Sequence, residues 1–316
     1  MGAGEGVILE LLKSECKKIN GNIHENFQIT GLSTDMNNLH GGELFVPIFH
    51  KDIDTKMLIK IAIEREVSAI LVEDSISLPE QMPEQLVTFT AENVKGLIRK
   101  MAILHLHDVD PTVIAVTGSQ GREITKEAII NILNMQFNVH YNVGQGDEID
   151  LLTSILKMDK KTDMYVCDFT IDTNIDDIEL KSKLVSPNYS VITNVRTEDN
   201  HFENLSMDIY KEAYSKIEAG MKASDVLVID GDATSFQSEW QSDVITCGYD
   251  EGCLFKIQEV AVQEETTHFQ VEGIRIPFQI SIDKDAVKNV VFAIAVAVHL
   301  GLLPDDMNKV FEKISV

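Results

Sequence analysis

The segment TGSQGREITK, residues 117–126, has the composition of a loop that binds phosphate. It follows an apolar run at 113–116 that is typical of a buried strand, and apolar residues at helical spacing follow it. Gly118 and Gly121 let the chain turn tightly and aim consecutive N–H groups at a phosphate. The first turn of the following helix adds a partial positive charge. The segment therefore predicts a strand, a phosphate-type loop and a helix that begins near Thr125.

Two positions of this loop depart from the usual chemistry. In such loops a lysine contacts the phosphates and a threonine or serine hydroxyl holds Mg²⁺, whereas this chain has Arg122 and Glu123. The planar arginine fork is not equivalent to an ammonium group. At ~4 Å and an effective dielectric constant near 20, each repulsion between Glu123 and a phosphate charge costs about 4 kcal/mol. We favour a structural turn that no longer binds nucleotide; the alternative is that Lys126, one helical turn further on, contacts phosphate instead.

Composition excludes several classes of function. The net charge is -24, from 27 basic and 51 acidic residues, which argues against nucleic acid and anionic membranes as partners. No apolar run is long enough to cross a bilayer, and the first residues do not resemble a signal peptide. The four cysteines form no CxxC pair and the nine histidines form no HExxH motif. We therefore expect a cytoplasmic protein with reduced cysteines.

Hydrophobic periodicity predicts an α/β chain of two domains, residues 1–92 and 93–316. The first domain has predicted helices at 7–18 and 54–67, strands at 27–35, 42–49 and 68–74, and a polar loop at 75–89 that contains two prolines. A helix at 91–110 leads into the second domain, where short apolar strands alternate with helices, as in a mostly parallel sheet. An antiparallel β-meander is expected between 253 and 280, and a helix that is apolar nearly all round at 286–302 must be well buried.

Several motifs together resemble the Mur ligases, the ATP-dependent amide ligases of peptidoglycan precursor synthesis. The loop TGSQGREITK is similar to TGSNGKTTTK of the members that add D-alanyl-D-alanine, and residues 29–49, ITGLSTDMNNLHGGELFVPIF, are similar to their N-terminal domain. The resemblance covers nearly the whole chain and implies a Mur-ligase-like N-terminal domain followed by the central, ATPase-type domain. It also implies that the third, C-terminal ligase domain is absent.

The resemblance places the family's functional residues on this chain one by one. In the nucleotide loop, Thr117, Gly118, Ser119, Gly121, Thr125 and Lys126 match, whereas the lysine and the Mg²⁺-binding hydroxyl fall on Arg122 and Glu123. A metal-binding glutamate falls on Asp168, which could equally be a buried or capping aspartate. The second metal ligand, a histidine, falls near His201, for which a surface histidine is the simpler interpretation. The carbamylated lysine falls on Tyr214, and only Asn289 remains of the adenine-contacting motif.

The uridine-diphosphate motif of the family is also altered. Its DSR sequence reads Asp35-Met36-Asn37 here, after Ser33, so the arginine that would face the nucleotide is missing. Because several independent sites change together, the sequence predicts a catalytically degenerate pseudoenzyme with a binding or scaffolding role and no cofactor. Its partner would be another protein or a second copy, and a UDP-linked cell-wall precursor stays open as a ligand. The alternatives are an active ATP- and Mg²⁺-dependent amide ligase, or a nucleotide sensor without turnover.

Overall fold

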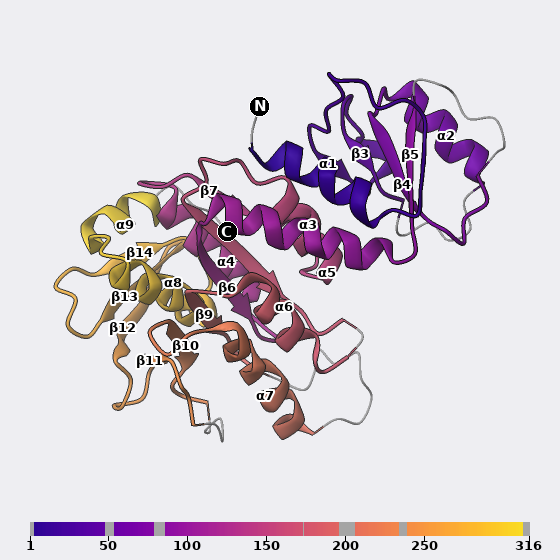
Figure 1. The fold of residues 1–316 in the computed structure, drawn as a ribbon. Coiled ribbons are helices and arrows are strands. Elements are labelled where there is room, and N and C mark those ends of the chain that lie inside the picture. Colours follow the sequence, from indigo (N-terminus) through magenta and orange to yellow (C-terminus); the bar gives the residue numbers. More distant parts are fainter. Residues whose placement is uncertain are drawn as a thin grey trace. The chain divides into compact units, whose positions relative to one another are not determined.

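The computed structural model describes residues 3–47, 54–78, 86–172, 174–195, 206–233 and 239–311. The chain forms two compact units, whose elements are labelled in Figure 1. Unit 1 comprises Met1–Asp110 and Leu151–Lys160, and unit 2 comprises Pro111–Asp150 and Lys161–Val316. The domain division at residue 92 stays a prediction. By packing, the helix that follows this position belongs to unit 1.

Unit 1 is built on a sheet with the strand order β1-β5-β4-β3-β2, in which β1 is antiparallel and the other strands are parallel. The predicted loop at 75–89 was wrong at its end, because the apolar residues after the prolines form a buried strand, β5, which lies between β1 and β4. The elements described in unit 1 are α1 (Ala3–Glu15), β1 (Lys18–Asn20), β2 (Leu32–Ser33), η1 (Met36–Asn38), β3 (Leu44–Phe45), α2 (Thr55–Glu64), β4 (Ala69–Glu73), β5 (Val87–Ala91) and α3 (Val94–Val109).

Unit 2 contains a sheet of nine described strands in the order β14-β13-β12-β11-β10-β9-β6-β8-β7. The strands from β7 to β12 pair in parallel, and β12, β13 and β14 form the predicted antiparallel meander. The strands are β6 (Thr112–Thr117), β7 (Val139–Tyr141), β8 (Met164–Phe169), β9 (Tyr189–Ile192), β10 (Val226–Asp230), β11 (Asp243–Gly248), β12 (Phe255–Gln263), β13 (Thr266–Val271) and β14 (Phe278–Ile280).

The helices of unit 2 connect these strands and cover the sheet. They are α4 (Arg122–Leu133), α6 (Asp177–Val185), α7 (Met207–Ser215), η2 (Lys216–Gly220), η3 (Lys284–Ala286), α8 (Val287–His299) and α9 (Pro304–Phe311), and α5 (Glu148–Leu156) begins here and ends in unit 1. The helix α8 packs against α4 and against β10, β11 and β12, as its apolar sequence predicts. Figure 1 shows the meander, α8 and α9 grouped at one side of the sheet.

The carboxyl ends of the parallel strands meet along one edge of the sheet in unit 2. The loop after β6, the end of β8, the residues after β9 and the end of β10 all lie there, because these strands run in the same direction. In open parallel sheets this edge is where ligands bind. Among the described residues, no helix combines the length and the apolar composition needed to cross a membrane.

Candidate nucleotide-loop site

The loop between β6 and α4 turns on two glycines in the left-handed region. Gly118 has φ 132° and Gly121 has φ 78°. A Cβ atom on Gly118 would lie 2.1 Å from Oγ1 of Thr193, and one on Gly121 would lie 2.1 Å from Oδ1 of Asn289. Both positions therefore require glycine for conformation and for space. The helix α4 begins at Arg122, three residues before the predicted start.

The backbone of this loop bonds to the residues after β9. The N–H groups of Ser119 and Gln120 both donate to the carbonyl oxygen of Asn194, at 3.0 and 3.2 Å. The Ser119 hydroxyl donates to the same oxygen at 3.0 Å. In return, the Thr193 hydroxyl donates to the carbonyl oxygen of Gln120 at 2.8 Å. Two amides that a phosphate loop would aim at its ligand are therefore already satisfied within the protein.

Both cations of the loop pair with a single carboxylate, Asp168 on β8. Arg122 Nε lies 2.7 Å from Oδ2 of Asp168, and Lys126 Nζ lies 2.7 Å from Oδ1. Arg122 also donates to the carbonyl oxygen of Gly118 at 3.3 Å, and Lys126 donates to that of Asn142 at 3.2 Å. The interpretation of Asp168 as a buried residue fits this arrangement, because its side chain is only 1% exposed.

Asn142, which follows β7, holds the Asp168 backbone in place. Its side-chain oxygen accepts the N–H of Asp168 at 3.0 Å, and its side-chain amide donates to the Asp168 carbonyl oxygen at 3.4 Å. Both residues are buried, so the ion pairs with Arg122 and Lys126 lie where few waters compete with them. Sequence reasoning missed Asn142, because only the parallel pairing of β7 with β8 brings it beside Asp168.

Glu123 lies in the first turn of α4 and its side chain is exposed. A carboxylate at this position interacts favourably with the partial positive charge of the helix N-terminus. Arg122 and Lys126 carry two positive charges, and Glu123 and Asp168 carry two negative charges, so these four side chains have no net charge. A phosphate would therefore meet no excess of positive charge from these residues.

Two further predicted residues of the central domain, Thr125 and Tyr214, are buried. Thr125 is fully buried and its hydroxyl donates to the carbonyl oxygen of Asn289 at 3.2 Å. Tyr214, at the position of the carbamylated lysine, is buried on α7. A phenol cannot be carbamylated to bridge a metal. His201 lies outside the residues that the structure describes.

The residues at the uridine-type motif of unit 1 bond within their own loop. The Ser33 hydroxyl lies 3.4 Å from the carbonyl oxygen of Asp35 and 3.4 Å from its N–H group. The Asp35 carboxylate accepts the N–H of Asn37 at 2.9 Å and so caps the short helix η1. Ser33 is 1% exposed, whereas the side chains of Asp35 and Asn37 face solvent.

Lys181 on α6 is a further buried cation at the carboxyl edge. Its ammonium group donates to the carbonyl oxygens of Gly146 and Thr170, at 2.8 and 2.7 Å, and lies 2.8 Å from the Asp172 carboxylate. Burial lowers the pKa of Lys181, and the contact with Asp172 opposes that effect. The sequence signal was available, because Lys181 lies on the apolar stripe of α6 with Ile178.

Lys288, at the start of α8, joins Asp230, the last residue of β10, to Asp232, which follows that strand. Its ammonium group lies 2.8 Å from Asp230 and 2.7 Å from Asp232, and 5.8 Å from the centre of the Tyr249 ring. Burial opposes the charged form, but the hydrogen bonds to both carboxylates outweigh it and raise the pKa of Lys288. Sequence reasoning missed this lysine although it lies next to Asn289.

Within the described ranges, no group of three or more His, Cys, Asp or Glu side chains is arranged to hold a metal ion.

The strand–glycine loop–helix unit at the carboxyl edge of a parallel sheet defines a fold of the nucleotide-loop class. A family model described as the Mur ligase middle domain matches residues 116–297, more than half of the chain. The chain therefore belongs to the Mur ligase family.

Curated relatives and solved structures agree with this assignment. The chain is 30% identical over 289 residues to a UDP-N-acetylmuramoyl-tripeptide–D-alanyl-D-alanine ligase of Bacillus subtilis, covering 90% of this chain and 62% of the relative. It is 24% identical to the ligase of that name from Synechocystis, covering 89% of this chain and 60% of the relative. The chain thus spans about three fifths of the length of these relatives.

The fold matches solved ligase structures at low sequence identity. MurF from Acinetobacter baumannii has a TM-score of 0.81 at 17% identity, with 97% of this chain and 67% of that chain covered. MurF from Thermotoga maritima, solved in complex with ADP, has a TM-score of 0.74 at 22% identity, with 88% and 65% covered. These likenesses confirm the predicted α/β architecture, with its parallel sheets and antiparallel meander.

Proposed function

We propose that this chain is a Mur ligase family protein that binds or scaffolds and does not carry out ATP-dependent amide ligation. One observation carries the proposal: the Asp168 carboxylate pairs with both loop cations, Arg122 and Lys126, at 2.7 Å each. The family implies ATP and Mg²⁺ as cofactors. The residues at the loop do not fit the binding of ATP and Mg²⁺, for three separate reasons.

The first reason is the carboxylate itself. To hold Mg²⁺, Asp168 would have to release Arg122 or Lys126 and leave a cation unpaired in a site with little water. Removing one partner from a buried ion pair costs about 3–5 kcal/mol. A metal ion would have to supply at least that much additional binding free energy. Glu123, at the position of the metal-binding hydroxyl, is exposed.

The second reason concerns the phosphate contacts. Lys126 was the candidate for a substitute phosphate contact, but its ammonium group is directed to Asp168 and to the Asn142 carbonyl oxygen. The third reason is that the N–H groups of Ser119 and Gln120 donate to Asn194. A triphosphate would have to displace each of these bonds, and each displaced polar group would need a new partner.

The experiment is a calorimetric titration of the protein with ATP and Mg²⁺, run beside a thermal melting assay. The Bacillus subtilis relative, titrated under the same conditions, serves as the positive control. We expect no binding heat and no melting shift for this chain. Binding without release of ADP would favour the sensor, and release of ADP that depends on a UDP-linked precursor would replace the proposal with an active ligase.

The ligand or partner of the scaffold is a second part of the proposal. The curated relatives are named for a UDP-N-acetylmuramoyl-tripeptide, so a UDP-linked cell-wall precursor is the small molecule to test first. We place the protein in the cytoplasm, with another protein or a second copy of the chain as its partner. Affinity capture from native cytoplasm, with and without added precursor, identifies the partner and shows whether the precursor changes its binding.

A further inference from the structure

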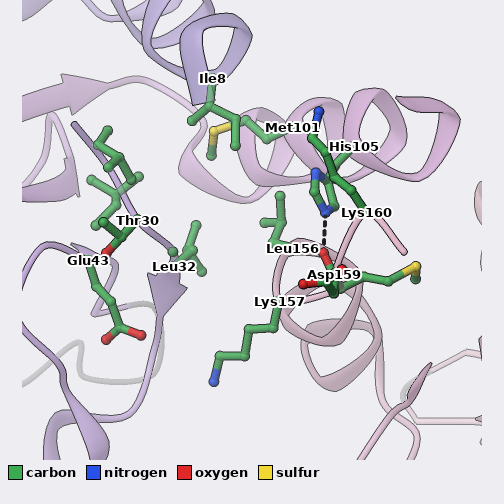
Figure 2. Close-up of a pocket in the computed structure, with 14 residues that line it drawn as sticks. Ile8, Thr30, Leu32, Glu43, Met101, His105, Leu156, Lys157, Asp159 and Lys160 are labelled. Atoms are coloured by element: carbon green, nitrogen blue, oxygen red, sulfur yellow. Dashed lines mark hydrogen bonds between the residues drawn. The ribbon is translucent and has the colours of Figure 1, made fainter. Parts of the chain in front are cut away.

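Unit 1 contains a pocket of about 380 Å³ that is lined by part of the 29–49 motif but not by Ser33, Asp35 or Asn37. Its walls come from α1, from the residues that lead into β2 and β3, from α3, and from the segment 156–160. Figure 2 shows Leu32 and Leu156 pointing toward one another, with Ile8 and Met101 on a third side. Ser33 ends β2, and Asp35 and Asn37 follow that strand, whereas the pocket is lined by residues at and before the starts of β2 and β3. The pocket is therefore separate from the uridine-type motif.

The floor of this pocket is apolar. Leu32, Leu44, Met101, Leu156 and Met158 are all buried and all contribute to its lining. Small-molecule sites typically have volumes of roughly 300–1,000 Å³ and mostly apolar walls with a few polar groups. The size and lining thus suit the apolar body of a small ligand of about ten to fifteen heavy atoms.

The polar groups around the floor are mostly occupied by protein partners. The Glu43 carboxylate accepts the N–H of His40 at 2.8 Å, and Lys160 pairs with Asp108 at 2.6 Å. The His105 ring bonds through Nε2 to the carbonyl oxygen of Met158 at 2.9 Å. Its other ring nitrogen, Nδ1, is buried without a hydrogen-bond partner, so the wall contains an unused polar atom.

Lys157 differs from these groups. Its side chain is exposed, and among the described residues its ammonium group has no carboxylate or carbonyl partner. Figure 2 shows the Lys157 side chain extending from the residue that follows α5, on the same side of Leu156 as Leu32 and Glu43. A free positive charge beside an apolar floor complements a ligand with one negative group on an apolar body. Glu43 and Asp159 also line the pocket, and Lys157 is the lining cation that can pair with an anion because Lys160 is already paired with Asp108.

We propose that this pocket binds a small amphipathic anion, whose apolar body contacts Leu32, Met101 and Leu156 and whose negative head group pairs with Lys157. The site is independent of the nucleotide loop and of the proposed function. A carboxylate and a phosphate monoester would meet the same ammonium group, so comparing head groups on one apolar body distinguishes them.

The test uses octanoate, octyl phosphate and 1-octanol, which share an apolar body, in calorimetric titrations of the full chain. We expect both anions to bind at a single site more tightly than the alcohol. Lys157→Gln should weaken binding of the anions roughly three- to fivefold, the range of an exposed ion pair, and leave octanol unchanged. Lys60→Gln, which removes an exposed lysine of α2 outside the pocket, is the matched control and should change neither.

A second variant tests the floor. Ile8→Trp adds volume to the wall from α1 and should reduce binding of all three probes at least tenfold, with the melting temperature confirming that the variant folds. If that variant fails to fold, Lys157→Gln still decides the question, because its side chain is exposed and unpaired. Equal anion affinity in wild type and Lys157→Gln, or no saturable binding of octanoate and octyl phosphate, overturns the proposal.

Discussion

The ammonium group of Lys126 and the Asp168 carboxylate lie 2.7 Å apart, although 41 residues separate them in the sequence. The other oxygen of the same carboxylate binds Arg122, so one buried acid holds the start and the first turn of α4 against β8. Both cations of the nucleotide loop are therefore paired with a carboxylate of the same chain. This pairing also makes the stability of unit 2 depend on the residues that would otherwise bind ligand.

Replacing Asp168 by asparagine should destabilise the protein by about 3–5 kcal/mol, because the buried Lys126 and the partly buried Arg122 both lose their charge partner. Urea unfolding, followed by circular dichroism, measures the change in the free energy of unfolding. Glu123→Gln, which removes an exposed carboxylate from the same helix, should change that free energy by no more than about 0.5 kcal/mol. Equal effects of the two substitutions would show that the Asp168 pairs contribute nothing.

Gly121→Ala should lower stability by at least about 1–2 kcal/mol, because its φ of 78° suits glycine and the new methyl group meets Asn289. Gly252→Ala is the matched control, since that glycine has no positive φ and no atom within 4 Å of the added Cβ. Combining Gly121→Ala with Asn289→Ala should recover part of the loss in a double-mutant cycle. Strict additivity would contradict the close packing of Asn289 on the loop.

Restoring the lysine and threonine of the family loop should produce at least weak binding of ATP and Mg²⁺. The Arg122→Lys, Glu123→Thr double variant removes a repulsion of about 4 kcal/mol and supplies a hydroxyl for the metal. Binding should stay weak, because Asp168 still pairs with Lys126. Calorimetry measures the affinity, with Glu127→Thr, at an exposed position one turn further along α4, as the control. No gain in affinity would mean that the closed loop backbone dominates.

The Lys288 cluster predicts a defined dependence of stability on pH. Burial disfavours the charged forms of Lys288 and Asp232, but the hydrogen bond between these two side chains outweighs it. The pKa of Lys288 is therefore raised above its ordinary value of 10.5, and the pKa of Asp232 is lowered below its ordinary value of 3.8. Stabilisation from Lys288 is therefore full below pH 10.5 and lost as the pH rises through its higher folded value. That from Asp232 is present above pH 3.8 and lost as the pH falls through its lower folded value.

Lys288→Gln should accordingly cost about 2 kcal/mol, the value of a charged hydrogen bond, at every pH between about 5 and 9. The difference from wild type should shrink below pH 3.8 and above pH 10.5. Chemical unfolding across this range measures it, and Lys309→Gln, in an exposed pair with Asp306, should show a difference of less than about 0.5 kcal/mol throughout. If the difference in the free energy of unfolding between wild type and Lys288→Gln grew as the pH fell, it would contradict the pKa directions of Lys288 and Asp232.

Sequence pattern predicted the elements that depend on local periodicity. The parallel strands at 112–118, 164–169 and 189–195, the β-meander and the apolar helix α8 were expected and were found, because burial on both faces leaves continuous apolar runs. The short strands β5 and β7, whose hydrophobic patterns are weak, were not predicted. Their pairing is decided by neighbouring strands and not by their own few residues.

By itself, the sequence determined the family, the glycine turn and the presence of Arg122 and Glu123 where the loop chemistry is usually found. Only the tertiary structure decided what those residues do. Charge pairing acts through space, so the partners of Arg122 and Lys126 follow from the alignment of β6 beside β8 and not from any local motif. The same is true of Lys157, whose free ammonium group gains meaning only because folding places an apolar floor beside it.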